Sequence, residues 1–213
     1  INKGKKMRKF TIILISALFA LTSSAFAAGL VGVKLGQGYL EGNANAYTAG
    51  SNSYAAESGT KGSAFGAIFA EISLMESPIS AGIEYVPFDA DISLNGQNNT
   101  VSANLSDYTT VYALAAHEIS DELSVYAKIG YSMAEIGAVK PNDAATTVNS
   151  QSDSLEGMVY GFGFQSELPM GIVARAEYTY TDFDEISVTT TSHGSSAAKK
   201  TADGNLNAVT LSF

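Results

Sequence analysis

The sequence contains no cysteine and only two histidines in 213 residues. Without cysteine, neither a disulfide scaffold nor a metal site with thiolate ligands is possible. Basic residues are also scarce, because 12 Lys and Arg stand against 21 Asp and Glu, for a net charge of −9. Proteins bind nucleic acid through Lys and Arg that neutralise phosphates, so we expect no nucleic-acid partner. After residue 28, no segment has the period of an amphipathic helix.

The N-terminal segment has the three parts of a secretory signal peptide. A basic start at 7–9 precedes an uncharged apolar run at 11–21, and Ala25 and Ala27 form an A-x-A cleavage site. The apolar run is about half of the roughly 20 residues that a membrane-spanning helix needs. We therefore predict a signal peptide at 1–27, with 1–6 upstream of the true start at Met7. The remaining domain, 28–213, keeps all 21 acids but loses five of the 12 bases, so its net charge is −14.

The rest of the chain alternates apolar residues with small or polar ones, in segments of strand length. The clearest of them, 155–168, places Tyr160, Phe162 and Phe164 on one face with glycines between them. A similar segment follows after a short turn. In total we predict eight strands, at 30–40, 63–74, 79–88, 108–119, 123–134, 155–168, 172–183 and 206–213.

The connections between these segments alternate in length. Those at 75–78, 120–122 and 169–171 are tight turns with suitable turn residues, and those at 41–62, 89–107, 137–153 and 184–204 are long and polar. Every second connection of an up-and-down barrel falls at the same rim, and bacterial outer-membrane barrels have short turns at one rim and long loops at the other. We predict an all-β fold, an eight-stranded antiparallel up-and-down transmembrane β-barrel with four short periplasmic turns and four long extracellular loops. A soluble lipocalin-like barrel is the alternative.

A transmembrane barrel assigns the two faces of each strand. The continuous apolar faces point to lipid, and the faces with glycine and charge point into the lumen, which eight strands make just wide enough for side chains. Three acids and three bases within strands fall on the lumen face, and they should pair because an isolated buried charge is very costly. We favour a structural plug over an ion path for this network. Its members are Lys34, Glu71, Glu84, Lys128, Arg175 and Glu177.

Two further predictions concern tyrosine and histidine. We expect His117 in the lumen near the short-turn rim, as a satisfied polar residue, with Tyr112 and Leu114 on the opposite, lipid-facing side of the same strand. Tyrosines near strand ends should form the aromatic girdles of the barrel. These are Tyr39, Tyr85, Tyr112, Tyr131, Tyr178 and Tyr180.

Together, the signal peptide, eight strands, four long loops and final Phe213 resemble the opacity-protein and OmpA-like outer-membrane β-barrels over essentially all of 28–213. GIVARAEYTYTDF is similar to the penultimate strand of that family, and LSVYAKIGY to its fifth. Leu211 and Phe213 match the terminal signal that the barrel-insertion machinery reads, whereas Leu206 replaces its polar residue and Ala208 its glycine. The resemblance implies that machinery as a partner, together with outer-membrane lipid and lipopolysaccharide, and we expect a monomer.

The expected function is a non-enzymatic, structural envelope barrel that allows slow, porin-like passage of small solutes, with no cofactor and no specific metal site. One alternative is a surface adhesin or ligand-binding barrel that acts through its acidic loops, where acids outnumber bases eleven to four when Asp182, just before the last loop, is counted. Another is a lipid-modifying enzyme that uses His193, which has serines and aspartates nearby in the sequence. A catalytic triad needs the base within hydrogen-bond reach of both partners, and nothing in the sequence fixes that loop.

Overall fold

The computed structural model describes residues 29–49, 52–74, 77–95, 100–141, 146–192 and 197–213. The predicted signal peptide, with Ala25 and Ala27, lies outside the described residues, and so does His193. In the part of the chain that is described, no helix is long and apolar enough to cross a membrane.

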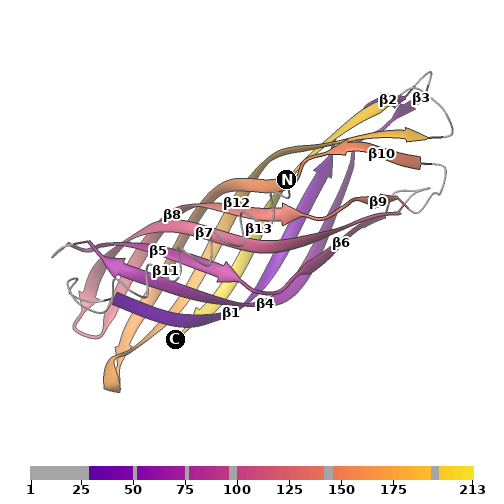
Figure 1. Cartoon of the computed structure of the whole chain (residues 1–213). Helices are drawn as coiled ribbons and strands as arrows, with labels where there is room; N and C mark the ends of the chain where they lie inside the picture. Colours follow the sequence, from indigo (N-terminus) through magenta and orange to yellow (C-terminus); the bar gives the residue numbers. More distant parts are fainter. Residues whose placement is uncertain (1–28, 50–51, 75–76, 96–99, 142–145, 193–196) are drawn as a thin grey trace.

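Eight long strands of the described residues form a closed ring, which Figure 1 shows as a tilted, twisted barrel. Each strand pairs antiparallel with the next long strand along the chain, and the last pairs with the first, which closes the ring. All eight predicted segments lie in this barrel, so the predicted up-and-down architecture is confirmed. In ring order the strands are β1 (Gly29–Ala44), β4 (Glu57–Ser73), β5 (Ile79–Val86), β7 (Thr100–Ser120), β8 (Leu123–Ile136), β11 (Ser154–Leu168), β12 (Ile172–Ser192) and β13 (Ala198–Ser212).

Short connections join the strands at one rim. They link β4 to β5, β7 to β8, and β11 to β12, the last through a 3-10 turn at Pro169–Gly171 in which Met170 and Gly171 have positive φ. The start of β1 and the end of β13 lie at this rim too, where the backbones of Val33 and Phe213 exchange two hydrogen bonds. The prediction of four short turns was therefore wrong by one. At the fourth place around this rim, the first strand begins and the last strand ends.

At the opposite rim the strands run further than predicted. β12 reaches Ser192 and β13 begins at Ala198, so most of the predicted loop at 184–204 is strand. Its SVTTT run is rich in β-branched residues, which are enriched in strands. The other long segments also contain short strands among the described residues: β2 (Tyr47–Ala49), β3 (Asn52–Tyr54), β6 (Ala90–Asn95), β9 (Lys140–Pro141) and β10 (Thr146–Gln151).

The two faces of the wall differ as the alternation predicts. Leu35, Phe162 and Val209 on the outer face are 65%, 59% and 61% exposed, whereas alternate residues of the same strands face the lumen. Large apolar side chains in such a continuous exposed band fit contact with lipid better than contact with water. The predicted insertion-signal residues Leu211 and Phe213 are also exposed.

One strand has the opposite orientation from the predicted one. In β7, Tyr112 and Leu114 are only 7% and 3% exposed and belong to the interior, while His117 is exposed on the other face. The predicted lumen position of His117 and the predicted girdle position of Tyr112 were therefore wrong. The alternation alone misled, because the outward positions next to Tyr112 and Leu114 include the small Ala113 and Ala115, and the large tyrosine finds a buried acceptor, Glu71, inside the barrel.

Candidate functional site in the barrel lumen

Four charged side chains meet at the centre of the lumen. Lys34 Nζ lies 2.6 Å from Glu84 Oε2 and 2.7 Å from Glu177 Oε1. Lys128 Nζ contacts the same two oxygens, at 3.1 and 3.2 Å. All four side chains are buried. Lys34, Glu84, Lys128 and Glu177 therefore form a neutral ring of alternating charge, which we call the ion quartet.

The ring order of the strands explains this alternation. Lys34 comes from β1, Glu84 from β5, Lys128 from β8 and Glu177 from β12, so every second strand of the barrel contributes one charge. The inward side chains of neighbouring strands compete for the same narrow space, and eight strands enclose room for little more than these. The ion quartet ties together four strands that do not pair with one another.

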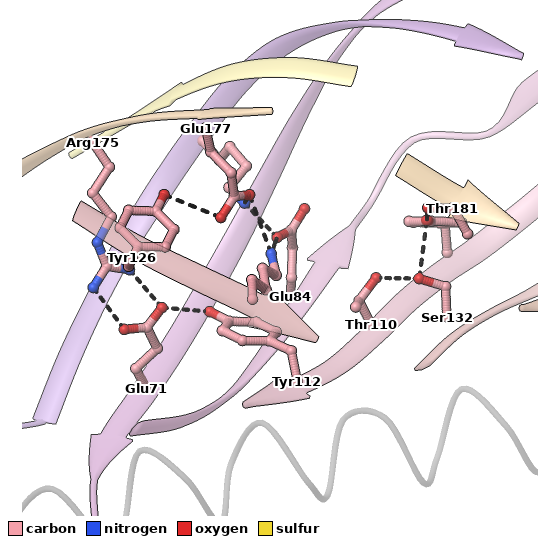
Figure 2. Close-up of polar contacts among 12 residues, drawn as sticks. Glu71, Glu84, Thr110, Tyr112, Tyr126, Ser132, Arg175, Glu177 and Thr181 are labelled. Carbon is pink, nitrogen blue, oxygen red and sulfur yellow. Dashed lines mark hydrogen bonds and ion pairs between the residues drawn. The ribbon is translucent and has the colours of Figure 1, made fainter. Parts of the chain in front are cut away.

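A second ion pair lies on the short-turn side of the ion quartet. Both terminal nitrogens of Arg175 donate to the carboxylate of Glu71, at 2.5 and 2.8 Å, and Arg175 Nε donates to Gln165 at 3.1 Å. The Arg175 guanidinium also lies 5.4 Å from the ring centre of Tyr126. Figure 2 shows this pair beside the ion quartet, and we call it the Arg175–Glu71 pair.

Two tyrosines complete the hydrogen bonding of the acids. Tyr112 donates to Glu71 at 2.7 Å, and Tyr126 donates to Glu177 at 3.1 Å (Figure 2). Lys128 Nζ lies 4.1 Å from the ring centre of Tyr112, a cation–π contact that links the two clusters. The lumen is therefore filled by a single connected network rather than by separate ion pairs.

Glycines make room for these aromatic rings. A Cβ atom on Gly82 would come within 2.5 Å of the Tyr112 ring, and one on Gly163 within 2.6 Å of the Tyr126 ring. No side chain fits at either position without displacing the ring. The inward glycines therefore serve packing, and their place in the sequence follows from the bulk of the tyrosines opposite.

A cluster of hydroxyl groups lies on the long-loop side of the ion quartet. Thr110 and Ser132 share a hydrogen bond of 2.6 Å, and Tyr108 donates to Ser132 at 3.0 Å. The Tyr108 hydroxyl is also 3.4 Å from Thr181 Oγ1. Figure 2 shows Thr110, Ser132 and Thr181 of this cluster. Polar side chains thus succeed one another along much of the barrel axis.

The structure brings all six predicted lumen charges into this network. Arg175 and Glu177, two residues apart on β12, do not pair with each other; each takes its partner from across the lumen. Sequence reasoning missed the roles of Tyr112 and Tyr126, although Tyr126 shares the inward parity of Lys128. Among the described residues, no group of His, Asp and Glu is arranged to hold a metal ion.

The fold resembles solved structures of outer-membrane proteins at low sequence identity. Neisserial surface protein A is 8% identical, with a TM-score of 0.45 over 86% of this chain and 99% of that chain. The attachment invasion locus protein Ail of Yersinia pestis is 14% identical, with a TM-score of 0.35 over 86% and 99%. The outer membrane protease OmpT from Escherichia coli is 8% identical, with a TM-score of 0.46 over 90% and 99%.

No curated protein matches the chain significantly in sequence. Residues 13–212, by contrast, match the family described as the outer membrane protein beta-barrel domain. The matched region includes all eight strands of the ring. The closed antiparallel barrel, its apolar outer face and its charged interior agree with this match. The chain belongs to the outer membrane protein β-barrel family, and its location is the outer membrane.

Proposed function

We propose that this protein is a non-enzymatic structural barrel of the outer membrane whose lumen is closed at rest by the ion quartet and the Arg175–Glu71 pair. The observation that carries the proposal is the ion quartet itself. Its four side chains come from every second strand and meet at 2.6 to 3.2 Å, so they cross the lumen from wall to wall. Solutes that pass at all must displace a neutral, fully paired cluster.

The energetic argument favours a plug over an open path. Removing one partner from a buried ion pair costs roughly 3–5 kcal/mol, because it leaves an uncompensated charge. A solute that separates Lys34 or Lys128 from both of its acids meets a barrier of at least that order. The hydrogen bond from Tyr126 holds Glu177 in place and adds to the cost of moving it.

Planar-bilayer conductance of the detergent-refolded chain tests the proposal. We expect no stable openings from the wild type, and we expect openings from a variant in which all four members of the ion quartet are changed to Ala, because that change is neutral and removes the side chains that cross the lumen. Ile129→Ala, on the exposed outer face, is the matched control and should remain silent. Heat-dependent gel migration confirms that each sample is folded.

Single variants distinguish the plug from a gate. Stable openings in the wild type that change in Arg175→Ala and Glu177→Ala would contradict the plug and make the protein a narrow, gated pore. Silence in the folded quadruple variant would show that other residues close the lumen.

Surface binding is a second candidate function. The observation in its favour is that β2, β3, β6, β9 and β10 give the long segments an ordered framework beyond the ring. Deleting the β2–β3 hairpin should then abolish binding to a cell-surface or matrix ligand while conductance stays unchanged.

A further inference from the structure

On one side of the barrel, toward the long-loop rim, β4 separates from the strand that follows it. β4 pairs with β5 only from Ile68 to Ser73, opposite Tyr85 to Ser80. Further out, β4 continues to Glu57 and pairs with β1 on its other side, whereas β6, which continues the course of β5, pairs with β7. Among the described residues, the edge of β4 at 57–67 that faces away from β1 has no partner strand.

The division is built into the fold by a kink between β5 and β6. Three residues, Pro87 to Asp89, stand opposite only two residues of β7, Ser106 and Asp107. Asp107 has φ of 55°, is buried, and accepts a 2.8 Å hydrogen bond from Tyr85. Pro87 has no N–H to donate, so the ladder from β5 to β4 cannot continue through it. The kink turns β6 away from β4.

The backbone groups on this open edge can be identified from the hydrogen-bond pattern. Leu74 N donates to Ile79 O, so the even-numbered residues of β4 direct their N–H and C=O groups toward the β5 side. Beyond the kink that side is empty of described strands. The residues with outward-directed N–H and C=O groups are Ser58, Thr60, Gly62, Ala64 and Gly66.

The surroundings of this edge define what it fits. Phe88 is 66% exposed and lies beside Gly66, where an added Cβ would be 3.6 Å from its ring. Asp89 is exposed at the same end, and Glu41 of β1 lies opposite Thr60 on the outward-facing parity. On the outer face, the edge residues Ser58, Thr60, Gly62, Ala64 and Gly66 have small side chains or none, so they leave room for larger ones on an added strand, while Lys61 and Phe65 lie on the opposite, inward parity. The edge therefore combines a free strand template, an aromatic contact and acidic neighbours.

We propose that the open edge of β4, residues 58–66, binds an extended, positively charged polypeptide segment by strand addition. Main-chain hydrogen bonds to an exposed sheet edge supply affinity in this mode, and contacts with alternate side chains supply specificity. Nine residues of strand span about 30 Å, enough to hold a segment of similar length. The acidic neighbours select basic side chains, and Phe88 contacts an apolar one. The proposal does not depend on the closed lumen.

Fluorescence anisotropy tests it with the refolded full chain in nanodiscs of zwitterionic lipid and a labelled ten-residue peptide of alternating lysine and valine. We expect saturable binding to the wild type. Ala64→Pro removes one free-edge N–H without touching the ladder to β1, and should weaken binding about tenfold. Ala64→Val adds similar bulk to Ala64→Pro but keeps the N–H, and should bind as the wild type does.

A second probe requires no variant. The same peptide with alternate backbone nitrogens methylated keeps its charge but cannot pair as a strand, so it should not bind. Equal binding of both peptides would overturn the proposal in favour of simple charge attraction, as would wild-type affinity in Ala64→Pro. Sedimentation that shows a dimer of the wild type, dissociated by Ala64→Pro, would overturn it in favour of a second copy of the chain.

Discussion

The ion quartet and the Arg175–Glu71 pair share one lumen but hold their charges differently. In the ion quartet, two lysines share the same two carboxylate oxygens, so every charge has two partners on separate strands. In the Arg175–Glu71 pair, a planar guanidinium grips both oxygens of a single carboxylate and links β12 to β4. The quartet depends on charge balance, whereas the pair depends on geometry.

This difference leads to different weaknesses. A lysine acts as a compact point charge, so the ion quartet tolerates small shifts in position but not a change in net charge. Arginine presents a fixed fork, so the Arg175–Glu71 pair tolerates little change in shape even when charge is kept. Changes that separate charge from shape should therefore affect the two clusters in opposite ways.

The largest effect should come from unbalancing the ion quartet. Lys128→Met keeps most of the side-chain volume but leaves Glu84 and Glu177 with only Lys34 between them. We expect the free energy of unfolding to fall by roughly 3–5 kcal/mol, since a net negative charge stays buried. Urea unfolding of the barrel in lipid vesicles, followed by tyrosine fluorescence, measures it.

A double variant separates charge balance from the loss of contacts. Lys128→Met with Glu84→Gln leaves the single pair Lys34–Glu177, which is neutral. The double variant should be more stable than the sum of the single changes predicts, with a coupling of about 0.5–3 kcal/mol. Strict additivity would contradict the charge-balance account. Ile129→Met, on the exposed outer face, controls for the change to methionine.

The sequence predicted most of what places this network. Glycine-and-charge faces alternating with apolar faces identified the strands, and parity put Lys34, Glu84, Lys128 and Glu177 on one side of the wall. Their partners could not be predicted, because partners depend on which strands lie across the ring and on how far each is displaced along its neighbour. Arg175 and Glu177 lie two residues apart on one strand and one face, yet each takes its partner from another strand.

The two errors of orientation and length have physical causes as well. In β7 the register shifts between Ser106 and Thr109, so the face of Tyr112 cannot be extrapolated from the chain before the bulge. Polar runs such as that in β12 resemble loops in the sequence because no face of them is apolar. A strand that protrudes into water needs no apolar face; it needs a partner for its backbone, and β13 supplies it.

A smaller effect should follow when the Arg175–Glu71 pair loses its shape but keeps its charge. Arg175→Lys leaves one ammonium group near Glu71 and removes the bond from Nε to Gln165. We expect a loss of roughly 1–3 kcal/mol in the same unfolding measurement, because the bidentate hydrogen bonds are replaced by one. Lys128→Arg is the matched test in the ion quartet. A cost for Arg175→Lys below about 0.5 kcal/mol, which is the usual range of surface substitutions, would remove the distinction between a cluster held by charge and one held by shape.

The smallest and most discriminating effect lies in the two tyrosine hydroxyls. Glu71 Oε1 accepts from both Tyr112 and Arg175, so Tyr112→Phe leaves that oxygen with a donor. Glu177 Oε2 accepts from Tyr126, while both lysines bind the other oxygen, so Tyr126→Phe leaves a buried carboxylate oxygen without its donor. An unsatisfied buried acceptor costs about 1–3 kcal/mol, whereas a hydrogen bond that is lost from a satisfied one costs about 0.5–1.5. Tyr126→Phe should therefore destabilise the barrel more than Tyr112→Phe does. The reverse order in urea unfolding would mean that the lysines shift to share both oxygens of Glu177, and that charge balance alone, without the Tyr126 hydroxyl, holds the ion quartet.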